Sequence, residues 1–176
     1  MFPKAHACAY VLSALRIAYF KVYYPIYYYA AYFSIREHDF DVYAMVNGYD
    51  KINETILMLE EKGYGRSNKE DNVLGCLRVV REASSRGIKF LTPRVNESEA
   101  KKFKVIDDKT LLLPFIAMDG LGEVVAENIV KERNVKEYSN IEEFEKRGKI
   151  SNTLIKEMRL LNMFDGMDES SQLSLF

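Results

Sequence analysis

The residues Gly120-Leu121-Gly122 are the strongest candidates for chemistry in this sequence. Glycines permit positive φ and a close approach of the backbone, and a helix is predicted to begin directly after Gly122. Successive peptide N–H groups and the positive end of that helix could receive a phosphate oxygen. We expect Leu121 to turn inward while Ala126 and Ile129 seat the helix on its partner. The alternative is a glycine-rich turn that only joins two helices.

The segments around this turn resemble a helix-hairpin-helix element. A short helix is expected around residues 114–117, before the turn, and the small Ala126 stands where such helix pairs approach closely. A dinucleotide-binding fingerprint is poorly supported, because no clear strand precedes the turn. The stretch therefore predicts contact with a phosphate backbone at Gly120, Leu121 and Gly122.

A looser second copy of the turn follows at residues 147–150. Gly148 and Lys149 are its predicted phosphate contacts, Ser151 is the predicted N-cap, and apolar residues at helical spacing follow. Paired hairpins of this kind grip both strands of a duplex. Residues 114–166 carry eight Lys or Arg against ten Asp or Glu, so backbone amides rather than a basic patch would have to make the contact.

The elements that position these turns are mostly helical. Apolar periodicity predicts helices at residues 5–24 and 26–35, a helical stretch at 39–62 that Gly48 interrupts, and a helix at 70–85 with Gly87 as its C-cap. Residues 88–91 are a predicted strand, and residues 103–106 and 110–113 a predicted hairpin. The expected fold class is mainly α with a small β hairpin (α+β).

The first predicted helix is apolar around its whole circumference, which indicates a helix buried on most sides in a larger body. A secretory signal or a membrane span fits poorly, because Arg16, Lys21 and Pro25 interrupt the apolar run. Two cysteines and two histidines cannot complete a structural zinc site. Reduced thiols and a cytoplasmic location are therefore expected.

The spacing of apolar residues changes from that of a helix to that of a strand near Gly87, and we expect the domain boundary there. Residues 62–109 hold twelve Lys or Arg against seven Asp or Glu, an excess that suits either an anionic neighbour or a solvated surface. The predicted division is a first domain at residues 1–88, a β hairpin with tandem helix-hairpin-helix elements at 89–166, and a flexible tail at 167–176.

The last residues change from polar to apolar and read Gln172-Leu173-Ser174-Leu175-Phe176. Three large apolar side chains are too few for a core, but they suit a peptide that enters a pocket on a partner. Such a contact is weak by itself and gains strength when a second site is bound at the same time.

Two stretches carry a resemblance to a known family. The residues FPKAHACAYVLSALRIAYFKVYYP resemble a segment of the fingers domain in the alpha subunit of bacterial DNA polymerase III, and QLSLF resembles the motif that replication proteins insert into the sliding clamp. Together with the Gly-Leu-Gly turn, they identify the chain as similar to the C-terminal part of the PolC type, along essentially its whole length.

The resemblance implies a helical end of a fingers domain, a duplex-binding domain, and a clamp-binding tail with Gln172, Leu173, Leu175 and Phe176 as its contacts. It places Lys4 and His6 near the triphosphate of the incoming nucleotide, although both also suit an ordinary helix start. The family joins nucleotides by two-metal chemistry on palm carboxylates, so Mg2+ is implied for the full polymerase. No segment here matches that palm, and the chain is expected to bind no cofactor and to be inactive alone.

The resemblance also defines the alternatives. Duplex DNA, the sliding clamp and the remainder of the polymerase are the expected partners, and no membrane is expected. A free-standing, non-catalytic adaptor that binds DNA and the clamp is the second hypothesis, and a membrane-anchored protein the third.

Asp119 stands where the family commonly has proline, and a carboxylate beside a phosphate site is unfavourable unless it caps a helix or faces away.

Overall fold

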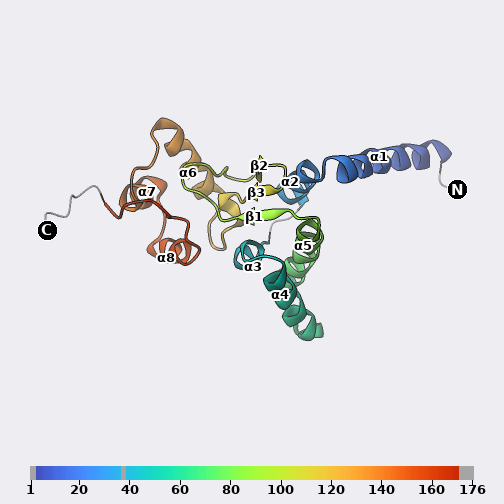
Figure 1. The fold of residues 1–176 in the computed structure, drawn as a ribbon, viewed down its shortest axis with the longest axis horizontal. Helices are drawn as coiled ribbons and strands as arrows, with labels where there is room; N and C mark the ends of the chain where they lie inside the picture. The colour runs from blue at the N-terminus through green and yellow to red at the C-terminus, as the bar shows by residue number, and fades with distance from the viewer. Residues whose placement is uncertain (1–2, 37–38, 171–176) are drawn as a thin grey trace.

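The computed structural model describes residues 3–36 and 39–170, and it confirms a mainly helical fold with one small sheet. Figure 1 shows the sheet near the middle of the molecule, with α1 extending to one side and α6, α7 and α8 on the other. The elements are α1 (Lys4–Tyr23), α2 (Pro25–Arg36), α3 (Val42–Val46), α4 (Tyr49–Glu61), η1 (Gly63–Gly65), α5 (Asn68–Ser85), β1 (Lys89–Leu91), β2 (Lys104–Asp107), β3 (Thr110–Leu112), η2 (Phe115–Ala117), α6 (Glu123–Val135), α7 (Ile141–Gly148) and α8 (Asn152–Leu160).

The sheet contains the predicted hairpin and a third strand. β2 and β3 are antiparallel, and β1 pairs with β3 in parallel, so the order is β1-β3-β2. The hairpin is confirmed, whereas the parallel pairing of β1 had no sequence signal. Phe90 of β1 packs against Phe33 of α2 with ring centroids 5.6 Å apart, so α2 contributes to the core beside the sheet.

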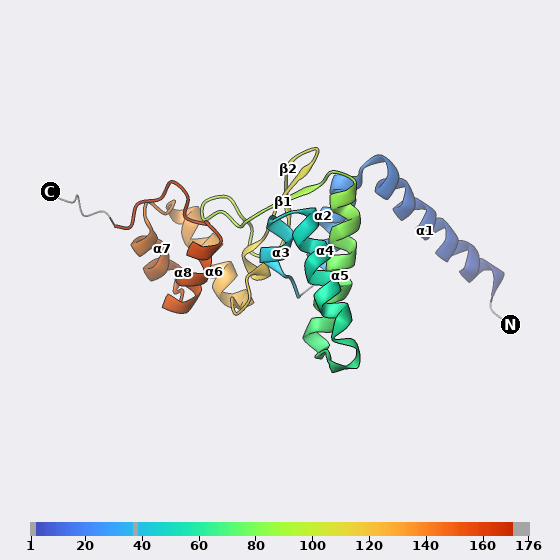
Figure 2. The ribbon, with the colours of Figure 1, turned by 60° about the horizontal axis from the view of Figure 1, so that its bottom comes forward.

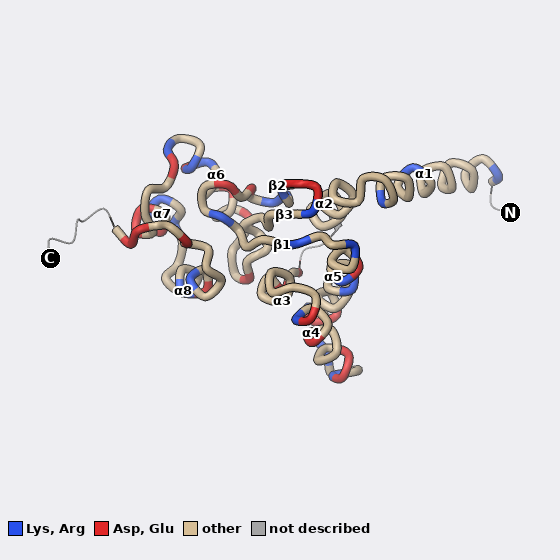
Figure 3. The backbone as a smooth tube through the Cα atoms, in the orientation of Figure 1, with Lys and Arg blue, Asp and Glu red and all other residues tan. Residues whose placement is uncertain are grey.

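Helix α1 projects from the rest of the molecule in two views related by a 60° rotation (Figures 1 and 2). All its side chains are exposed except the half-buried Lys21, and Figure 3 shows few charges along it. The expected cover on most sides is therefore not supplied by the described part of this chain. Among the described residues, no helix is long and apolar enough to cross a membrane.

Helices α3, α4 and α5 confirm the predicted breaks. Gly48 interrupts the stretch with a φ of 87°, and Gly87 follows α5 with a φ of 83°. Beyond that glycine, Ile88 N–H donates to Ala83 O (3.1 Å), which closes the end of the helix. α5 begins two residues earlier than expected, because Ser67 and Glu70 form a capping box that the sequence reading missed.

The core is one continuous cluster of buried side chains that runs from Ile26 in α2 to Phe164 after α8. In the C-terminal part, Phe144 of α7 lies at its centre, with ring centroids 5.0 Å from Tyr138 and 5.7 Å from Phe164. The boundary near residue 88 stays a prediction. Cys8 is exposed and Cys76 is buried, and these two described cysteines form no disulfide.

Candidate nucleic-acid interface

The first turn lies between η2 and α6 and has the geometry that its glycines predicted. Gly120 adopts a φ of 76°, Leu121 is buried, and Gly122 is the N-cap of α6. Leu121 N–H donates to Met118 O (3.2 Å), which tightens the turn. Gly122 has no side chain to cap the helix, so the first N–H groups of α6 are left for water or a ligand.

The second turn, between α7 and α8, repeats this order of conformations. Lys149 has a φ of 57°, Ile150 is buried, and Ser151 is the N-cap of α8. The three residues thus correspond to Gly120, Leu121 and Gly122 in turn. The structure thus has a helix, a turn and a helix here, and the residues that match the first turn lie one position later than the predicted pair Gly148 and Lys149.

Gly148 has a packing role in the structure. It is the buried last residue of α7, and a Cβ placed on it would lie 3.3 Å from Ile129 Cγ1 of α6. Asn128, next to Ile129, donates from its side-chain amide to the carbonyls of Arg147 (3.0 Å) and Gly148 (3.2 Å). These contacts join the two hairpins through α6, and a phosphate contact at Gly148 itself stays a prediction.

Acidic residues surround the first turn, and Asp119, Glu123 and Glu127 form ion pairs with lysines from other segments. Asp119 Oδ1 lies 2.7 Å from Lys69 Nζ of α5, and this ion pair lowers the pKa of the Asp119 carboxyl. Lys101 pairs with Glu123 in the first turn of α6, and with Glu127 at 2.7 Å. Two lysines from other segments thus face three carboxylates here, so they offset part of the negative charge around the first turn.

The second turn is electrostatically more favourable to an anion. Lys149 is exposed, and the first turn of α8 contains no acidic residue. Arg147 is engaged elsewhere, because it donates to Glu132 O and to Lys136 O (2.8 Å) at the end of α6 and pairs with Glu143 (2.8 Å). Lys149 is therefore the cation that this turn presents to solvent.

A hollow of about 380 Å3 lies over the first turn, lined by Asp39, Phe40, Lys69 and residues 116–123. A neighbouring hollow of about 450 Å3 has more apolar walls from α3, α4, α5 and α8. Lys69 and Asp119 line both, so their ion pair lies where the two hollows meet. Sequence reasoning missed Lys69, which is 50 residues from Asp119 and carries no motif.

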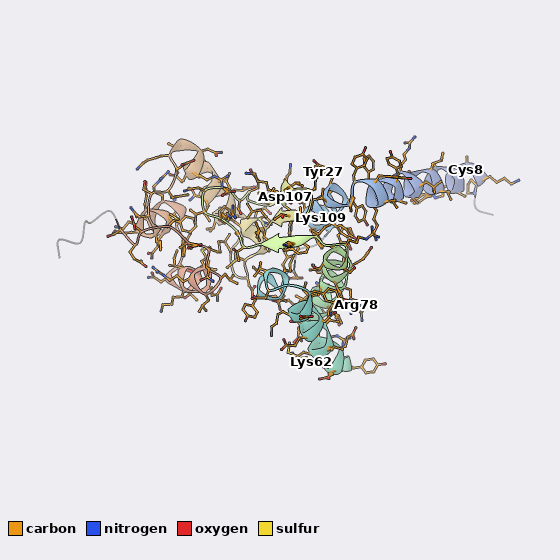
Figure 4. All side chains as sticks on the ribbon, in the orientation of Figure 1. Cys8, Tyr27, Lys62, Arg78, Asp107 and Lys109 are labelled. Atoms are coloured by element: carbon orange, nitrogen blue, oxygen red, sulfur yellow. The ribbon has the colours of Figure 1, made fainter. Side chains whose placement is uncertain are left out.

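Lys4 and His6 are not brought near either turn. Both are exposed at the far end of α1, close to Cys8, which Figure 4 labels near the end of the projecting helix. The His6 and Tyr10 rings lie 4.5 Å apart. Within the part of the chain that the structure describes, no group of three or more His, Cys, Asp or Glu side chains could hold a metal ion.

The predicted tail contacts Gln172, Leu173, Leu175 and Phe176 lie outside the described residues. The chain just before them is fixed, since Ile141 and Glu142 at the start of α7 donate their N–H groups to Asp168 O (3.0 Å) and Glu169 O (3.1 Å). Arg159 of α8 also binds both carboxylate oxygens of Glu169. These contacts join residues 168 and 169 to α7 and α8, the two helices that flank the second turn.

Comparison with known proteins gives two findings. Residues 87–173 match the family described as "Helix-hairpin-helix motif". The whole chain is 45% identical to the protein named DNA polymerase III PolC-type from Latilactobacillus sakei, 46% identical to that from Streptococcus mutans and 44% identical to that from Listeria monocytogenes. Each alignment covers 100% of this chain and 12% of the relative, so the chain spans about an eighth of those proteins' length.

Proposed function

Because this chain is homologous over its whole length to one segment of the PolC-type DNA polymerase III proteins, we propose that it is the duplex-holding segment of a replicative DNA polymerase. The larger protein would carry out DNA-templated DNA synthesis. This segment would hold the duplex without regard to sequence, and it would be inactive alone.

The repeated turn geometry is the observation that carries this proposal. Gly120-Leu121-Gly122 and Lys149-Ile150-Ser151 each combine a left-handed residue, a buried apolar residue and a helix N-cap. Peptide N–H groups at a helix start bind phosphate oxygens, and they carry no base information. α6 begins at the first turn and packs against the second, so the two sites are held in a fixed relation.

Electrostatics sets the expected strength of binding. The second turn presents Lys149, whereas the cations around the first turn are paired with acids. Few phosphates would be neutralised by free cations, so affinity should be modest and should fall only gently with salt. Strong base preference would contradict contact through the backbone alone.

We further propose that the tail residues Gln172, Leu173, Leu175 and Phe176 bind a sliding clamp. Support comes from the likeness of QLSLF to the clamp-binding motif and from the hydrogen bonds that hold Asp168 and Glu169 at the start of α7, close in sequence to that motif. A weak peptide contact becomes effective when the same chain is also bound to DNA.

The exposed apolar surface of α1 supports a place inside a larger protein rather than in a free-standing adaptor. Tyr10, Leu15 and Tyr23 are each more than 60% exposed, and such surfaces are normally covered. We propose that the remainder of the polymerase covers α1 and that Lys4 and His6 then face the triphosphate of the incoming nucleotide. The described residues offer no carboxylate cluster for Mg2+, so we assign that ion and the bond-forming step to the remainder.

Duplex binding can be tested by fluorescence anisotropy with a labelled random-sequence duplex and the 176-residue chain. We expect the variant Lys149→Glu to raise Kd by about tenfold, because it reverses the charge at a phosphate contact. Arg16→Glu makes the same charge change at an exposed position of α1, which lies on the other side of the sheet from α6, α7 and α8 (Figure 1), and it should change Kd by less than about twofold. Equal effects of the two variants would leave only non-specific attraction, and the proposal would fail.

A further inference from the structure

The ion pair between Lys69 and Asp119 connects helix α5 to the first turn across 50 residues of sequence. Its two charged atoms lie 2.7 Å apart, and the side chains are 55% and 77% exposed. An exposed pair of this kind contributes little to folding stability. Asp119, however, stands immediately before Gly120, so the pair can affect the charge beside the first turn.

Lys69 is poorly placed for the helix that carries it. It lies in the first turn of α5, two positions after the N-cap Ser67, where the positive end of the helix disfavours a cation. The capping box of Ser67 and Glu70 fixes the start of this helix, and Lys62, labelled in Figure 4, pairs with Glu70 at 2.5 Å. The fixed start of α5 thus holds Lys69 next to Asp119.

Asp119 is the acid with the greatest potential to interfere with the first turn. Glu123 is held by Lys101, and Asp39, which lines the same hollow, accepts a hydrogen bond from Asn72 (2.9 Å). Asp119 precedes the left-handed glycine directly, so an unpaired carboxylate there would repel a phosphate approaching the N–H groups of the turn.

We infer that Lys69 is a positioning residue for the first turn: it holds the Asp119 carboxylate against α5 and neutralises it, so that the turn can receive a phosphate. This inference rests on the proposed duplex binding. Lys69 acts through Asp119 and does not itself contact the DNA. The two residues therefore have opposite effects on affinity, although they are partners in one ion pair.

The test is a double-mutant cycle of Lys69→Ala and Asp119→Asn, measured by anisotropy with the random-sequence duplex between 50 and 200 mM salt, roughly the range in which phosphate contacts are resolved. We expect Lys69→Ala to raise Kd by about fivefold, the effect of one unscreened charge near a phosphate in water. Asp119→Asn should bind as tightly as the parent chain or more tightly. Lys69→Ala should have no further effect in the Asp119→Asn background, and Lys69→Arg should keep parental affinity.

Two results would overturn the inference while leaving duplex binding in place. If both single variants weaken binding alike, the ion pair is only a structural link. If Lys69→Ala weakens binding equally in both backgrounds and lowers the salt slope by about one, Lys69 contacts a phosphate directly. Failure of the parent chain itself to bind duplex DNA would instead overturn the proposed function, and the inference with it. Circular dichroism of each variant checks that the fold is retained.

Discussion

Ile129 of α6 and Gly148 of α7 lie so close together that a Cβ on Gly148 would come within 3.3 Å of Ile129 Cγ1. The same atom would lie 2.8 Å from Ile150 Cδ1, in the second turn. Both isoleucines are buried, so neither can move freely into solvent. The missing side chain at residue 148 therefore sets the spacing between the two hairpins.

Gly148→Ala should lower the free energy of unfolding by about 1–3 kcal/mol, because the added methyl group overpacks a closed interior. Urea denaturation followed by circular dichroism measures this change. Gly75→Ala is the matched control, since Gly75 lies in the interior of α5 with nothing within 4 Å of the new Cβ. That substitution should raise stability by about 0.5–1 kcal/mol, as expected for alanine in a helix. Stabilisation by both variants would contradict the close packing of α6 and α7.

Lys149→Gly should affect folding and DNA binding in opposite directions. Lys149 has a φ of 57°, a conformation that glycine adopts without the steric cost of a Cβ, so the variant should be more stable by up to about 1 kcal/mol. It should also bind duplex DNA several-fold more weakly, roughly the loss expected for one phosphate contact. Asn162→Gly, at a φ of 54°, is the control for the backbone effect alone. Unchanged DNA binding by Lys149→Gly would remove this lysine from the interface.

Glu143→Gln should alter stability in a pH-dependent manner. The Ser139 N–H, Lys136 and Arg147 lower the pKa of Glu143 to about 2, from an ordinary value of 4.5. A depressed folded pKa stabilises the protein above pH 4.5, and this contribution is lost as pH falls toward 2. The difference in unfolding free energy between parent and variant should thus be largest near neutral pH and should vanish near pH 2. Urea titrations at several pH values measure it, with Glu137→Gln as the control for losing one exposed negative charge; a pH-independent difference would contradict the assignment.

Deletion of residues 172–176 should abolish binding to a bacterial sliding clamp and leave duplex binding and the melting temperature unchanged. The reason is that the anchoring contacts of Asp168 and Glu169 precede the deletion. Isothermal titration calorimetry against the clamp measures the first effect. The double substitution Leu173→Ala with Phe176→Ala should have the same result, while Ser171→Ala with Ser174→Ala should not. A simultaneous loss of DNA binding would mean that the tail belongs to the folded domain.

Much of the local structure could be predicted from the sequence, because it depends on residues close together in the chain. Gly48 and Gly87 marked helix ends through their need for positive φ, and Leu121 was correctly expected to turn inward. The helix start at Ser67 was missed although the spacing Ser67 to Glu70 is that of a capping box. The capping residues Ser67 and Glu70 are polar and precede the apolar periodicity of the helix, so the periodicity alone places the helix start too late.

Contacts between distant segments could not be predicted in the same way. The parallel pairing of β1 with β3 depends on how the hairpin packs on α2, and strand periodicity does not specify a partner. Lys69 and Asp119 are two ordinary surface residues until the fold brings them together. The apolar circumference of α1 predicted a helix buried on most sides, whereas the described part of this chain leaves it exposed.

The anchoring of Glu169 limits where a clamp could stand. Gln172 is three positions after Glu169, with Ser170 and Ser171 between them, and a fully extended chain of three steps reaches only about 10–11 Å. A clamp that held Gln172 would consequently be kept beside α7 and α8, which also carry the second turn. If both proposed contacts form, the clamp and the second turn would therefore bind neighbouring stretches of the same duplex.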